Sequence, residues 1–74
     1  MITVKVIRQS SGQPVQGVAV SLGFDGFSRG VTNRQNTDRN GEAHFTADNG
    51  NGQVYIDGRT RQRGYLSGRM VVYI

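Results

Sequence analysis

Length, composition and charge limit what this chain can be. Its 74 residues match one small domain, and because only 35% of them are apolar while 11 are Gly, we expect a small core and many turns. The absence of Cys excludes a disulfide framework, a thiolate nucleophile and a Cys-based zinc site. The net charge is +4, and every one of the nine basic residues except Lys5 is Arg.

The sequence shows no targeting or membrane segment. Its longest apolar run, Met70–Ile74, is far shorter than the roughly 20 residues that cross a bilayer, so no membrane insertion is expected. The first residues alternate like a strand and lack the charged start and apolar core of a signal peptide. A cytoplasmic location is therefore the default expectation.

Short runs that alternate apolar and polar residues predict β-strands in the first half of the chain. The first run covers residues 2–7, and the Gly and Pro of residues 10–14 then break it. A second strand is expected at 18–22. Residues 23–29 contain two Phe among Gly residues and predict an exposed turn or an irregular edge, after which residues 30–33 begin a third strand.

The second half continues the same pattern. The Asn40-Gly41 pair is the sharpest turn signal, since both residue types tolerate a positive φ, and Ala43, Phe45 and Ala47 mark the inward side of the strand that leaves it. The remaining elements are expected in this order: a turn at 48–52, a strand at 54–57, a turn at 57–58, a polar run at 59–63, Tyr65-Leu66, a turn at Gly68 and a last strand at 70–74.

About six or seven short strands without a helical period predict one all-β domain over residues 1–74, a small immunoglobulin-like antiparallel β-sandwich. Two segments, Gly12-Gln13-Pro14-Val15-Gln16-Gly17-Val18 and Thr37-Asp38-Arg39-Asn40-Gly41, resemble the carboxypeptidase regulatory-like domain family over roughly residues 2–57. That resemblance implies the transthyretin-like, or prealbumin-like, sandwich of this family. It also implies a non-catalytic module that contacts proteins or carbohydrate, often outside the cell or on its surface.

Catalysis, a metal and a cofactor are not expected. The chain has a single His, His44, on the polar side of a predicted strand, where an ordinary surface His is the simpler interpretation. Alternate oxygens at Asp38, Asn40 and Glu42 match only part of a calcium loop, so a structural turn is favoured. No Gly-x-Ser-x-Gly elbow accompanies the Ser residues, and the sequence does not predict an enzyme.

Arg59, Arg61 and Arg63 are the most pointed candidate binding residues. Residues two apart on a strand share a face, so their guanidinium groups are expected to project together, with Arg69 nearby and Tyr65 available for stacking. Such a stripe suits a polyanion, a nucleic acid or an acidic partner. The alternative is that the charges only protect an exposed edge strand from unwanted pairing.

Phe24 and Phe27 form a second candidate site. If both rings are exposed on their Gly-rich loop, they offer a contact for a partner or, together with Tyr65, for a glycan; if one is buried, it contributes to packing. The leading functional expectation is a non-catalytic binding or structural module that makes protein contacts. Self-association through strand edges is expected because so small a core gains stability from oligomerisation.

Overall fold

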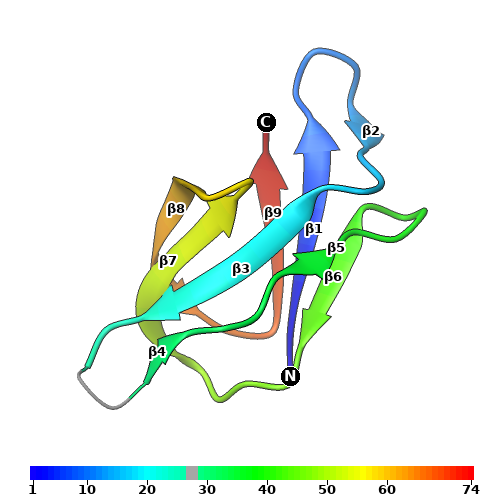
Figure 1. The fold of residues 1–74 in the computed structure, drawn as a ribbon. Helices are drawn as coiled ribbons and strands as arrows, with labels where there is room; N and C mark the ends of the chain where they lie inside the picture. The colour runs from blue at the N-terminus through cyan, green and yellow to red at the C-terminus, as the bar shows by residue number, and fades with distance from the viewer. Residues whose placement is uncertain (27–28) are drawn as a thin grey trace.

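In the computed structural model, which describes residues 1–26 and 29–74, the chain folds into two β-sheets packed face to face (Figure 1). The all-β sandwich expected from the alternating runs is confirmed. The described residues contain no helix long and apolar enough to cross a membrane. The strands within them are β1 (Ile2–Arg8), β2 (Gln13–Pro14), β3 (Ala19–Phe24), β4 (Gly30–Val31), β5 (Gln35–Asn36), β6 (Glu42–Phe45), β7 (Gly50–Ile56), β8 (Arg59–Leu66) and β9 (Arg69–Tyr73).

The first sheet is organised around β1, which has partners along both of its sides. Along one side, the N–H of Val6 donates to the carbonyl of Gly41 and the carbonyl of Val6 accepts from the N–H of Val15. β6 and β2 therefore pair with successive parts of the same side of β1, at Ile2–Lys5 and at Ile7–Arg8. Along the other side, β9 pairs in parallel, with Thr3 opposite Arg69. The expectation of antiparallel pairing fails for this ladder, because β9 arrives from β8 in the other sheet and no hairpin fixes its direction relative to β1.

The second sheet contains the order β4-β3-β7-β8, with β5 pairing β3 beside β4. All of these ladders are antiparallel. β8 joins the polar run at 59–63 and Tyr65-Leu66 into one strand, with Gly64 opposite Gly52 of β7. The β7–β8 ladder has a bulge, since Val54 lies opposite Gln62 and the next residue of β7 lies opposite Thr60.

Three of the strands have only two residues each, and two of these, β2 and β5, lie where the sequence predicts no strand. β2 exists as a partner of the end of β1, while β4 and β5 pair with the two ends of β3. β4 lies at the start of the strand expected at 30–33, whereas β2 and β5 have too few residues to show an alternating pattern, so the sequence carries no signal for those two.

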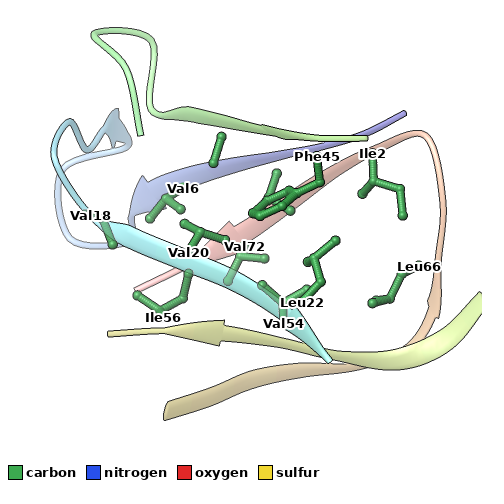
Figure 2. Close-up of a cluster of buried hydrophobic side chains, with 12 residues drawn as sticks. Ile2, Val6, Val18, Val20, Leu22, Phe45, Val54, Ile56, Leu66 and Val72 are labelled. Carbon is green, nitrogen blue, oxygen red and sulfur yellow. The ribbon is translucent and has the colours of Figure 1, made fainter. Parts of the chain in front are cut away.

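The core lies between the sheets and contains the inward side chains predicted from the alternation (Figure 2). Full burial of an aliphatic side chain contributes about 1.5–3 kcal/mol, so this cluster is the main source of stability. Its members come from six segments: Ile2, Val4 and Val6; Val18, Val20 and Leu22; Ala43 and Phe45; Val54 and Ile56; Leu66; and Val72.

The two segments that carry the family resemblance meet in space. The buried hydroxyl of Thr37 donates to the carbonyl of Val15 at 2.6 Å and accepts from the N–H of Val18 at 3.0 Å. Gly41 closes the turn with a φ of 74°, and a Cβ built on it would lie 2.7 Å from the carbonyl oxygen of Val6 and 2.9 Å from Cβ of Pro14. Glycine is therefore required there both by the turn and by the close approach.

Candidate functional site

β9 forms an edge of the first sheet, and its outer side has no partner strand in the part of the chain that the structure describes. The N–H of Ile74 donates to the carbonyl of Ile7, so the even-numbered positions of this segment direct their backbone groups towards β1. Backbone groups alternate in direction along a strand. The backbone groups that face the open side therefore belong to Arg69, Val71 and Tyr73.

The same alternate residues place their side chains on the solvent face of the sheet. Val71 is 42% exposed and Tyr73 is 58% exposed. Tyr73 lies opposite Ile7 on β1, and Ile7 lies opposite the exposed Pro14 on β2. Because directly paired residues share a face, Ile7, Pro14, Val71 and Tyr73 together form an apolar patch beside the open edge.

The predicted arginine stripe does not form one face. The bulge leaves Arg61 without a direct partner on β7, so Arg59 lies opposite the core residue Ile56 while Arg63 lies opposite Gln53. Because Ile56 and Gln53 point to opposite faces of β7, Arg59 and Arg63 do as well. The alternation rule fails here because one inserted residue reverses the facing of everything beyond it.

Arg59 and Arg61 instead line a common hollow of about 360 Å³. Ile56 and Ile74 supply its apolar lining, and Asp57 also lines it. Ile74 follows β9 in the first sheet whereas the other lining residues belong to the β7–β8 hairpin, so the hollow lies at one end of the sandwich between the sheets.

The other members of the predicted cluster lie elsewhere. Arg63 and the exposed Tyr65 share the solvent face of the second sheet, where Tyr65 lies opposite Asn51. Arg69 lies in the first sheet and forms an ion pair with Glu42, whose side chain is only 13% exposed. The five residues grouped by the sequence thus occupy three separate surfaces.

The aromatic loop is described only in part. Phe24 is half-buried and packs against the core, and the guanidinium carbon of Arg29 lies 3.8 Å from the centre of its ring. Arg29 also donates to the carbonyls of Asp48 and Asn49, at 2.6 and 3.0 Å. Arg29 therefore joins two loops over the Phe24 ring. Phe27 lies outside the described residues.

A polar network, which the sequence does not predict, crosses the outer face of β1 and β6. Thr3 Oγ1 lies 2.9 Å from Nδ1 of His44, and Nε2 of His44 lies 3.8 Å from a carboxylate oxygen of Asp38. The N–H groups of Glu42 and Asn40 donate to the other oxygen of Asp38. The hydrogen bond from Glu42 is the main reason that the pKa of Asp38 lies below its usual 3.8.

This network has the residue types of a nucleophile, a base and an acid but not their geometry. At 3.8 Å the carboxylate of Asp38 is too far from His44 to orient the ring by a hydrogen bond. Both side chains are about half exposed, so solvent competes for every contact. The arrangement stabilises the turn and the β1–β6 pairing more directly than it prepares Thr3 for attack.

Three residues of this network have side chains of the kind that bind metal ions. Asp38, Glu42 and His44 each offer a ligand atom, and these atoms lie within 4.8 Å of one another. However, Glu42 is paired with Arg69, and one oxygen of Asp38 is held by two backbone N–H groups. A cation would therefore have to compete with Arg69 for Glu42. The carboxylates of Asp38 and Glu42 already have partners within the protein.

Two of these features were missed by sequence reasoning for different reasons. The polar network follows from the β1–β6 register, which places Thr3 opposite His44 and Lys5 opposite Glu42. The outward positions of both strands could have been read from their alternation, but their pairing could not. The hollow depends on the bulge at Arg61, which has no signature in the sequence.

No model of a known protein family matches this chain, and no curated protein matches it either. The role of the chain is therefore argued from its own residues.

Proposed function

We propose that this chain is a non-catalytic protein-contact module that associates with a second copy of itself through the open edge of β9. The observation that carries the proposal is the coincidence of two features on one strand. The backbone groups of Arg69, Val71 and Tyr73 face the open side, and the side chains of Val71 and Tyr73 are exposed beside them. An exposed strand edge is a template for pairing with another chain.

The sequence of β9 suits antiparallel pairing with its own copy. If Val71 lies opposite Val71 of the second copy, Arg69 lies opposite Tyr73, and the contact is closed by a two-fold axis. About six backbone hydrogen bonds can then form. The charge of Arg69 is already compensated by Glu42, so pairing does not bring two uncompensated charges together at this edge.

We also propose membership of the carboxypeptidase regulatory-like domain family, which the comparisons do not establish. Its support is the contact between the two resembling segments, since Thr37 bonds to both Val15 and Val18. Family membership is compatible with the contact role but is not needed for it. Self-association requires only the open edge of β9.

The experiment is the absolute mass by light scattering over protein concentrations from tens of micromolar to about one millimolar, at low and high salt. Specific stable interfaces bury roughly 1,200–2,000 Å², and a five-residue strand pair buries less, so a concentration-dependent dimer is expected. Backbone pairing and apolar contact are weakly screened, so the dimer should persist at high salt.

A matched pair of variants locates the interface. Val71→Lys places like charges opposite one another across the two-fold axis and should leave a monomer. Val31→Lys adds the same charge at a position on β4 that is 65% exposed and should still dimerise. A monomer for the unmodified chain at one millimolar, or equal behaviour of the two variants, refutes the proposal.

A further inference from the structure

The hollow at the end of the β7–β8 hairpin is the surface that the proposed self-association leaves unused. Its charged lining comes from Arg59, Arg61 and Asp57, so it carries one net positive charge over an apolar floor of Ile56 and Ile74. A guanidinium nitrogen of a further arginine, Arg34, lies beside the same turn, because a Cβ built on Gly58 would come within 3.4 Å of it. The end of the sandwich is thus basic with an apolar centre.

The two arginines of the hollow have no protein partner among the described residues. In the described part of the chain, the ion pairs join Arg69 to Glu42 and His44 to Asp38. The arginine side chains that donate hydrogen bonds there are those of Arg29 and Arg69. Arg59 and Arg61 are therefore available to an external anion. Guanidinium groups bind carboxylates in a planar, two-bond geometry that Lys cannot match.

The hollow adjoins an open strand. β8 pairs only with β7 among the strands that the structure describes, and its other side is the edge of the second sheet (Figure 1). A second copy of this chain is a poor occupant of that edge, since antiparallel pairing of β8 with itself around Arg61 sets Arg61 opposite its own copy and brings Arg59 near Arg63 of the second copy, so that like charges meet. The charge pattern instead selects a strand of opposite sign.

We propose that β8 and the hollow bind an extended acidic peptide segment of a partner protein. The peptide adds a strand to the edge of β8, and a Glu or Asp side chain enters the hollow with its carboxylate between Arg59 and Arg61 and its methylene groups against Ile56 and Ile74. Main-chain pairing supplies affinity in such strand addition, and side-chain pockets supply specificity.

A nucleic acid fits these surfaces less well than a peptide. Arg63 and Tyr65 lie on the opposite face of the sheet from Arg59, so the chain does not present one continuous basic stripe beside a stacking ring. Binding along a phosphate backbone needs such a continuous track. The apolar floor of the hollow also favours a carboxylate on an aliphatic stem over a bare phosphate.

The test is fluorescence anisotropy with a labelled, acetylated and amidated peptide of sequence Glu-Val-Glu-Thr-Glu-Val-Glu-Thr. Arg59→Gln/Arg61→Gln should weaken binding about tenfold or more. Lys5→Gln/Arg39→Gln removes the same charge from the outer face of the first sheet and from an exposed turn, away from β8 and the hollow, and should change binding less than about twofold. Circular dichroism of each variant checks that the sandwich is intact.

A charge change of the opposite sign sharpens the test. Asp57 has a φ of 51°, which Asn also tolerates in an Asn-Gly turn, so Asp57→Asn should keep the hairpin. Removing this negative charge from the lining of the hollow should strengthen binding about two- to threefold. Binding unchanged or weakened by Asp57→Asn contradicts the placement of the carboxylate in the hollow.

Further arms separate the alternatives. Two further peptides carry N-methyl groups on alternate amides, one at the odd-numbered and one at the even-numbered residues. Strand addition predicts that one of the two loses binding, because its methyl groups replace the N–H groups that pair with β8. If both bind as tightly as the parent peptide, strand addition is wrong. An oligothymidylate that binds as tightly as the peptide and depends on the same two arginines overturns the choice of a peptide. Equal losses in Arg59→Gln/Arg61→Gln and Lys5→Gln/Arg39→Gln, or no binding at millimolar protein, overturn the site. Repeating the titration with Val71→Lys shows whether binding is independent of self-association.

Discussion

Gly52→Ala probes how closely β3 and β7 approach in the second sheet. Gly52 is buried and lies opposite Phe24 of β3. A Cβ at this position would overlap the carbonyl oxygen of Gly23 and lie 2.9 Å from its carbonyl carbon and 3.0 Å from Cα of Phe24. These are backbone atoms of a paired strand, so the overlap is relieved only by moving the ladder.

The neighbouring Gly23→Ala is the matched comparison. Its Cβ would meet the ring of Tyr55, at 2.7 Å from Cε2 and 2.8 Å from the hydroxyl oxygen. Tyr55 points to the solvent face and its side chain can rotate away, which backbone cannot do. Overpacking costs typically 1–3 kcal/mol and occasionally more. We therefore expect about 3 kcal/mol or more for Gly52→Ala and about 1 kcal/mol for Gly23→Ala.

This difference is large for so small a protein. A chain of this length has a free energy of unfolding of about 4–11 kcal/mol, and each 1 kcal/mol shifts the Tm by about 4–8 °C. Urea unfolding followed by circular dichroism measures both variants against the unmodified chain. A loss for Gly52→Ala equal to or smaller than that for Gly23→Ala would show that the two strands are farther apart than described.

Two further predictions concern the segment that follows β5. Thr37→Val should lower the free energy of unfolding by about 1–3 kcal/mol, because it leaves the buried N–H of Val18 without its acceptor. Urea unfolding measures this free energy, and the control Thr46→Val, at an exposed position, should change it little. The pKa of Asp38 is depressed by the N–H of Glu42, so the stabilisation from this carboxylate is present above the unfolded pKa and is lost as pH falls through the lower folded value. Titration by NMR should give a pKa below 3.8, and Asp38→Asn should remove that part of the acid dependence; a pKa at or above the usual value would contradict the hydrogen-bonded turn.

The parts of the fold that the sequence predicts are those governed by local periodicity. Val4 and Val20 are buried as their alternation requires, and the turn forms at Asn40-Gly41 as predicted, although only Gly41 of the pair has a positive φ. Such features depend on a few neighbouring residues, so one sequence is enough to read them.

The features that escape prediction depend on pairing between distant segments. Nothing near Arg69 indicates that β9 lies parallel to β1, because the hydrophobic alternation of β9 is the same in either direction. Likewise, the alternation of Arg59 and Arg63 predicts one face, and only the bulge at Arg61 separates them. The candidate surfaces rest on these two pairings, which explains why the sequence names the arginines but not their grouping.

The most direct measurement of the self-association proposed for β9 is disulfide formation by Val71→Cys. The chain has no Cys of its own, so any covalent dimer must arise from the introduced residue. In the antiparallel pairing centred on position 71, the two Cα atoms lie about 5.5 Å apart, within the 4.4–6.8 Å usual for a disulfide.

Val31→Cys provides an exposed thiol on β4, away from the proposed interface. Under mild oxidation, non-reducing electrophoresis should show rapid and nearly complete covalent dimer for Val71→Cys and only slow, concentration-driven dimer for Val31→Cys. Equal rates for the two variants, or no dimer for Val71→Cys, would show that β9 does not pair with a second copy of the chain.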